Sequence, residues 1–117
     1  MFGVTMSNLK QFFNQSLHSI FPENANYDYE ESSNKIRITY KIPEERRINY
    51  KSSQPICLHF DKCVIDEFRN AKTSKLNKLE RSLKKFLQIS LSNYDENGPH
   101  DSAFNIHVDD RILDSDF

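Results

Sequence analysis

Cysteine and histidine side chains that could bind a transition metal occur in the pattern Cys-x-His-x3-Cys, at Cys57, His59 and Cys63. Residues 55–60 alternate as a strand does, so Cys57 and His59 are expected on the same outward face. His107 holds the matching outward position of the last predicted strand. A structural zinc site needs four ligands, usually supplied as two spaced pairs. Because a second pair is missing, we expect no stoichiometric metal and interpret these residues as ordinary strand and surface side chains.

A second group with possible metal chemistry surrounds Gly98, where Asp95, Asn97 and Asp101 offer oxygen ligands of the kind that calcium prefers. An EF-hand loop requires glycine at its sixth position and glutamate at its twelfth. Counted from Asp95, Gly98 is fourth and Ile106 is twelfth, so we expect an acidic turn instead. Further carboxylates lie in the tail: Asp109, Asp110, Asp114 and Asp116. That segment is predicted to fray, whereas acid–base or magnesium chemistry needs preorganised groups.

The glycine content excludes several classes of enzyme. Gly3 and Gly98 are the two glycines of the sequence, so neither G-x-G-x-x-G nor G-x-x-x-x-G-K-[ST] can be formed from it. The nucleophile elbow G-x-S-x-G is excluded by the same count. We therefore assign no catalytic or cofactor-binding residue, and we expect a non-enzymatic protein that uses no cofactor.

Charge is distributed unevenly along a chain whose net charge is only −1. Residues 71–88 carry six basic residues and one acidic residue, whereas residues 89–117 carry seven acidic residues and Arg111. On a predicted helix over residues 74–93, the face opposite the leucine stripe carries a basic ridge: Lys78, Arg81, Lys84 and Lys85. Such a face is either solvated, or a docking surface for an acidic partner, or a phosphate-binding surface. The ridge is our predicted partner-binding site.

The elements that would position these residues follow from hydrophobic periodicity. We expect helices at 7–21, 62–71 and 74–93, and strands at 27–31, 35–42, 55–60 and 103–109. The order is α-β-β-β-α-α-β, and alternating strands favour an antiparallel four-stranded sheet with helices packed on one face, an α+β fold. The length of 117 residues fits a single domain over 1–117, with 1–6 and 110–117 frayed apart from Ile112 and Leu113.

The first two strands should form a hairpin. Residues 35–42 alternate without a fault, and a two-residue loop at Ser33-Asn34 would set the register. In that register Tyr27 faces Tyr40, Tyr29 faces Ile38, and Glu30 faces Arg37. Apolar residues then oppose apolar residues, and opposite charges meet, as cross-strand pairing favours.

The expected location is the cytoplasm. No apolar run approaches the ~20 residues that a membrane helix needs, so we expect no membrane partner. Met1–Phe13 has no basic region followed by an apolar stretch, so a secretory signal is not expected. Two cysteines cannot form the disulfide framework of a small secreted domain.

Three segments carry a resemblance to a known family: IRITYKIPEERR (36–47), ICLHF (56–60) and IDEF (65–68). They resemble a family of short, uncharacterised proteobacterial proteins, over roughly residues 20–90. In that family a strand ending in Pro-Glu leads through paired arginines into an apolar strand, followed by an Ile-x-x-Phe/Tyr helix and a basic helix. The resemblance implies bacterial origin and adds no activity, cofactor or site.

These observations favour a small bacterial cytoplasmic protein that acts through protein–protein interaction. We expect a homodimer, because the edges of an open sheet must be covered or paired. One alternative is an inhibitor or chaperone-like factor of the secretion-chaperone, anti-CRISPR or toxin-immunity type. Another is nucleic-acid binding through the basic helix at 74–93.

Overall fold

The computed structural model describes the backbone of residues 6–113 and the side chains of residues 9–113. The helices are α1 (Met6–His18), α2 (Lys62–Asn70) and α3 (Thr73–Ser90). The strands are β1 (Asn26–Glu30), β2 (Lys35–Thr39), β3 (Ile56–Phe60) and β4 (Phe104–Val108). Short 3-10 turns complete the chain: η1 (Glu31–Ser33), η2 (Glu44–Arg46), η3 (Leu91–Asn93) and η4 (Asp110–Leu113). The predicted element order and the α+β class are therefore confirmed.

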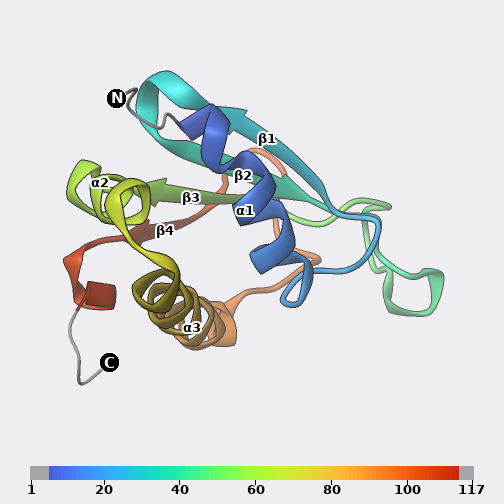
Figure 1. Cartoon of the computed structure of the whole chain (residues 1–117). Coiled ribbons are helices and arrows are strands. Elements are labelled where there is room, and N and C mark those ends of the chain that lie inside the picture. Colours follow the sequence, from blue (N-terminus) through green and yellow to red (C-terminus); the bar gives the residue numbers. More distant parts are fainter. Residues whose placement is uncertain (1–5, 114–117) are drawn as a thin grey trace.

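The four strands lie side by side in chain order, β1-β2-β3-β4 (Figure 1). β1 with β2 and β2 with β3 are antiparallel, but β3 and β4 are parallel. The prediction of a purely antiparallel sheet is therefore wrong for the last pair. The cause is the connection between these strands, which contains α2 and α3. It returns the chain to the end of the sheet at which β3 began, as a crossover connection does.

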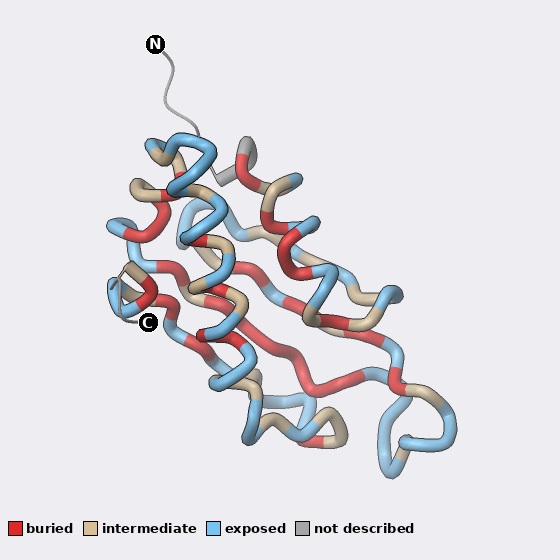
Figure 2. The backbone as a smooth tube through the Cα atoms, turned by 60° about the horizontal axis from the view of Figure 1, so that its bottom comes forward, coloured by how far each residue is buried: buried red, intermediate tan, exposed pale blue. Residues whose placement is uncertain are grey.

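All three helices contribute to one hydrophobic core. The same cluster of buried side chains contains residues from α1, α2 and α3 and the inward-facing residues of the strands. Burial along the backbone is concentrated where the helices meet the sheet (Figure 2). The outer sheet face is polar, with Arg37, Asn105 and His107 exposed. This segregation supports the predicted packing of the helices on one face.

α1 is held to the rest of the core by an aromatic cluster and by hydrogen bonds that include a partly buried one to α3. The Phe13 ring centroid lies 5.0 Å from that of Phe60 in β3 and 5.3 Å from that of Phe68 in α2. The Ser16 hydroxyl donates to Glu80 Oε2 of α3 at 2.6 Å. Phe13 therefore joins three elements, and its side chain is fully buried.

The hairpin register differs from the prediction by two residues. The observed pairs are Tyr27 with Ile38, Tyr29 with Ile36, and Glu30 with Lys35. The connection spans residues 31–34, and Asn34 alone has a positive φ, at 52°. A tight two-residue turn of the favoured I′ type needs positive φ at both central residues, so the longer connection forms. Since side chains alternate with a period of two, a shift of two keeps both tyrosines on the predicted face.

The end of the described chain is folded, whereas the sequence predicted fraying from residue 110 with the exception of Ile112 and Leu113. Asp110–Leu113 forms η4, which packs on α3 and buries Ile112 to 1% exposure. Met6 likewise belongs to α1. The other residues predicted to fray, 1–5 and 114–117, lie outside the described residues. None of the described helices is both long enough and apolar enough to span a membrane.

Candidate functional site

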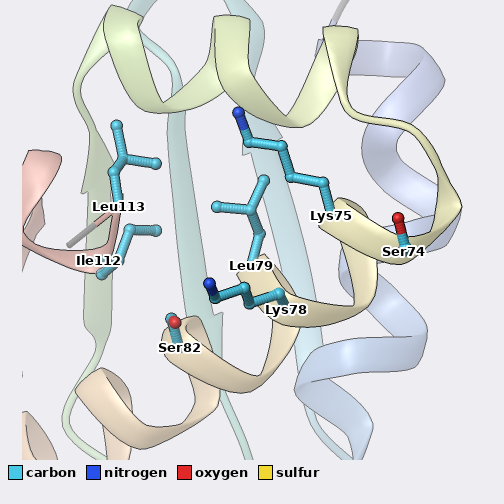
Figure 3. A pocket seen from close by; sticks show the side chains of 7 residues that line it. All are labelled: Ser74, Lys75, Lys78, Leu79, Ser82, Ile112 and Leu113. Atoms are coloured by element: carbon cyan, nitrogen blue, oxygen red, sulfur yellow. The ribbon is translucent and has the colours of Figure 1, made fainter. Parts of the chain in front are cut away.

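A groove of about 410 Å³ lies between α3 and η4 (Figure 3). Its lining combines apolar, hydroxyl and basic side chains: Ser74, Lys75, Lys78, Leu79, Ser82, Ile112 and Leu113. We call this surface the α3–η4 groove. The apolar residues come from both elements, so the groove exists only because η4 returns to the helix.

Each wall of the groove has a local cause. α3 is amphipathic, and its buried stripe of Leu79, Leu83, Phe86 and Leu87 turns the basic side chains outward. η4 is fixed by Arg111, whose guanidinium lies 5.1 Å from the Phe86 ring centroid. The Arg111 Nε also donates to Asp109 Oδ1 at 2.8 Å, and this hydrogen bond holds the pKa of Asp109 below its ordinary value.

The two lysines of the groove differ in their electrostatic surroundings. Lys75 extends toward α2 and forms an ion pair with Glu67 at 2.7 Å. Lys78 points toward the side of the groove formed by Ile112 (Figure 3). Within the described part of the chain Lys78 has no ion-pair partner. An exposed ammonium beside an apolar floor favours a ligand with a carboxylate next to an apolar group.

The structure divides the predicted basic ridge between two sides of α3. Lys78 lines the α3–η4 groove, and Arg81 is exposed. Lys84 is half-buried and pairs with Glu80 at 3.6 Å, and Glu80 accepts a hydrogen bond from α1. Lys84 therefore belongs to the side of the helix that faces α1. Lys85 is exposed and is engaged in a contact of its own.

Ile112 and Leu113 were excepted from the tail that the sequence predicted to fray, but this apolar half of the groove was not placed in a site. Ile112 and Leu113 lie in a tail that is otherwise acidic, and a short 3-10 turn offers too few residues for a periodic pattern. The available signal was this apolar pair itself, since adjacent large apolar residues in a polar tail often mark a segment that docks on the core.

The side chains considered as possible transition-metal ligands are not gathered into one site. His59 and His107 stack with ring centroids 4.8 Å apart, as expected from their matched strand positions. Cys57 is buried between the strands and Cys63 is exposed on α2. Across residues 9–113, no group of three Cys, His, Asp or Glu side chains is arranged to hold a metal ion. His59 Nε2 instead bonds Asn105 Oδ1 at 2.8 Å.

The acidic turn around Gly98 has a structural role. It secures a long arm, residues 40–55, which protrudes from one end of the sheet between β2 and β3 (Figure 1). Asn97 Oδ1 accepts from the Ile48 N–H at 3.0 Å, and Asn97 Nδ2 donates to the Arg46 carbonyl at 3.0 Å. A Cβ atom at Gly98 would lie 2.6 Å from Gln54 Oε1 and 3.1 Å from the Asp95 carbonyl oxygen, so a larger residue would displace the Gln54 side chain.

Glu96 is the charged centre of this attachment. Its carboxylate accepts from Tyr40 Oη at 2.9 Å and from Arg46 Nε at 2.9 Å. The Arg46 hydrogen bonds lower the pKa of Glu96 below its ordinary value. Burial, followed by the hydrogen bond to Glu96, raises the pKa of the Tyr40 hydroxyl.

We expect Glu96→Gln to reduce the free energy of unfolding at pH 7 by about 1–2 kcal/mol, because it weakens charge-assisted hydrogen bonds. A carboxylate whose pKa is lowered by folding stabilises the fold above its unfolded-state pKa, and this contribution is lost as pH falls through the folded pKa. The difference between wild type and variant should therefore shrink below about pH 4. Urea unfolding of wild type and variant at pH 7 and below about pH 4 measures this difference. Glu44→Gln, at an exposed position, is the control. A difference that stays constant with pH would contradict the role of Glu96.

Comparisons with known proteins add no family to this picture. No protein-family model matches the chain, and no curated protein or solved structure matches it either. The resemblance to short proteobacterial proteins therefore stays a prediction.

Proposed function

We propose that the protein is a non-enzymatic binding domain that captures an acidic, partly apolar segment of another protein in the α3–η4 groove. The observation that carries this proposal is the position of Lys78, an exposed cation beside the apolar floor formed by Leu79 and Ile112. A segment with one large apolar side chain next to aspartate or glutamate fits both features. A homodimer remains part of the proposal, because the sheet has open edges.

The two parts of the groove would contribute differently to binding. An exposed ion pair is worth about 0–1 kcal/mol, so Lys78 and Arg81 would mainly steer and orient the ligand. Burial of one large apolar side chain gives about 1.5–3 kcal/mol. Affinity should therefore come mainly from the apolar floor, and specificity for acidic segments from Lys78 and Arg81.

The charge pattern gives less support to nucleic-acid binding. Lys75 and Lys84 are already paired with Glu67 and Glu80. Phosphate binding requires several cations that are available together, and these pairs reduce that number on α3. Nucleic acid is therefore one of the alternative outcomes of the test.

The protruding arm supports a second candidate function, that of an inhibitor which inserts a loop into a partner. Ile48 is 75% exposed at the arm, although its backbone N–H is fixed by Asn97. A preordered loop that presents an apolar side chain is suited to this use, because little conformational entropy is lost on binding.

Our proposal also includes a reducing compartment of a bacterial cell. Cys57 and Cys63 are free thiols, and Cys63 is exposed to solvent. Exposed thiols are typical of reducing compartments, whereas secreted domains usually pair them.

The proposal can be tested by selecting ligands from a random displayed peptide library on the wild-type protein. We expect the selected peptides to combine aspartate or glutamate with large apolar residues. Lys78→Glu should weaken their binding by about tenfold, because it replaces an attraction with a repulsion. Raising the salt concentration should reduce this difference, since exposed charges are screened.

Lys62→Glu is the matched control, because Lys62 is an exposed lysine on the neighbouring helix α2. It should leave peptide binding unchanged. Equal binding by wild type and Lys78→Glu would contradict the groove as the site. Loss of binding in Ile48→Asp alone would favour the arm as the binding site. If the selection yields no peptide and a random single-stranded DNA probe binds in a salt-dependent way, nucleic acid would be favoured instead.

A further inference from the structure

The edge strand β4 carries outward-facing backbone groups. In its parallel pair with β3, the Phe104 N–H donates to the Pro55 carbonyl at 2.8 Å, and the Val108 carbonyl accepts from the residue after β3 at 3.0 Å. Alternate residues of a strand direct their backbone groups to opposite sides. Asn105 and His107 therefore direct theirs away from β3. β4 ends the strand order, so no strand in residues 6–113 pairs with them.

The two edges of the sheet differ in charge. β1 carries Asp28 and Glu30, both exposed, and self-pairing would bring these carboxylates together. Charged side chains of this kind protect an edge strand from pairing with another chain. β4 has the sequence FNIHV and contains no Asp, Glu, Lys or Arg. An edge without such protection is suited to the addition of another strand.

We infer that β4 pairs antiparallel with β4 of a second copy, across a twofold axis at Ile106. The available backbone groups define this register. The Ala103 carbonyl already accepts from Asn105 Nδ2 at 3.3 Å, so the outward groups that remain are centred on Asn105 and His107. With the axis at Ile106, Asn105 of each copy faces His107 of the other. Each such pair exchanges two N–H to carbonyl hydrogen bonds, and the two sheets become one.

The side chains are compatible with the same register. On the helix face Ile106 would oppose its own copy and Phe104 would oppose Val108 of the second copy, so each contact is apolar. A pocket of about 310 Å³ runs along this edge, with Phe86, Phe104 and Arg111 in its lining. It provides space for apolar side chains of the second copy beside β4. Cross-strand apolar pairs add to the backbone hydrogen bonds of a ladder.

This pairing does not depend on the α3–η4 groove. The groove is formed by side chains of α3 and η4, whereas the pairing uses the backbone of β4. Lys78→Glu should therefore leave the dimer intact, and a variant that blocks the edge should still capture acidic peptides. The pairing thus specifies the homodimer of the proposed function, and it can fail separately from peptide capture in the groove.

The experiment compares self-association of wild type, His107→Pro and His107→Ala by sedimentation velocity over a concentration series. Proline at residue 107 removes an N–H that points away from β3 and breaks no hydrogen bond to β3. Proline is tolerated at such a position of an edge strand. Two donors are lost per dimer, and we expect dimerisation to weaken by about 10- to 100-fold. His107→Ala keeps the N–H and should remain dimeric.

Amide exchange of the wild-type protein tests the same edge without a substitution. The Asn105 and His107 amides should become protected as protein concentration rises, whereas the outward Tyr27 amide of β1 should not. Protection of Tyr27 instead, or a wild-type protein that stays monomeric over the whole series, would overturn the inference. A folded His107→Pro variant that dimerises like wild type would overturn it as well.

Discussion

Replacing Phe13 with alanine should lower the free energy of unfolding by about 3–5 kcal/mol, the usual cost of truncating a buried phenylalanine. Phe13 is fully buried, and its ring contacts those of Phe60 and Phe68 from two other elements. The cavity would lie where α1, β3 and α2 meet, so little collapse is expected. Domains of this size are stable by about 5–15 kcal/mol, so the loss is a large share of the total. Urea unfolding measures it.

Two controls separate packing from helix propensity. Gln11→Ala changes an exposed position of the same helix and should alter stability by no more than about 0.5 kcal/mol. Phe13→Leu keeps part of the buried volume and should cost less than alanine. If Phe13→Ala were as stable as Gln11→Ala, α1 could not be packed on the sheet as described.

Replacing Ile112 with alanine should cost about 2–5 kcal/mol, because its side chain is 1% exposed and anchors η4 on α3. The same change removes part of the apolar floor of the α3–η4 groove. Peptide capture should therefore weaken even under conditions in which the variant is fully folded. Urea unfolding and peptide binding at low temperature measure the two effects separately.

Leu113→Ala is the matched comparison, since Leu113 is only half-buried and should cost less stability than Ile112→Ala. A frayed end at these two residues would make both changes nearly neutral. An effect of Ile112→Ala within about 0.5 kcal/mol of wild type would thus contradict the docking of η4.

Periodicity in the sequence predicted the elements and their inward faces. The alternation at Ile36 and Ile38 placed both side chains in the core, where they are fully buried. A period of two fixes which face a residue occupies, but it fixes neither the partner strand nor its direction. The predicted hairpin register and the predicted antiparallel pairing of β4 were therefore wrong, because a turn conformation and a two-helix crossover decide them.

The candidate site was predicted only in part for a related reason. Helical periodicity placed Lys78 and Arg81 on the outer face of α3, as observed. It could not show that Lys84 leans toward Glu80 while Lys78 borders the groove. That division depends on which neighbours α3 has on each side, namely α1 and η4. These are tertiary contacts between residues far apart in the chain.

The most direct measurement is an NMR titration of the isotope-labelled protein with a selected acidic peptide. Binding in the α3–η4 groove should shift the signals of Ser74, Lys78, Leu79, Ser82 and Leu113, and Lys78→Glu should require about tenfold more peptide for the same shifts. Shifts confined to Ile48 and Tyr50 of the arm, or to His59 and Asn105 on the outer sheet face, would contradict the groove as the binding site. So would the absence of any shift.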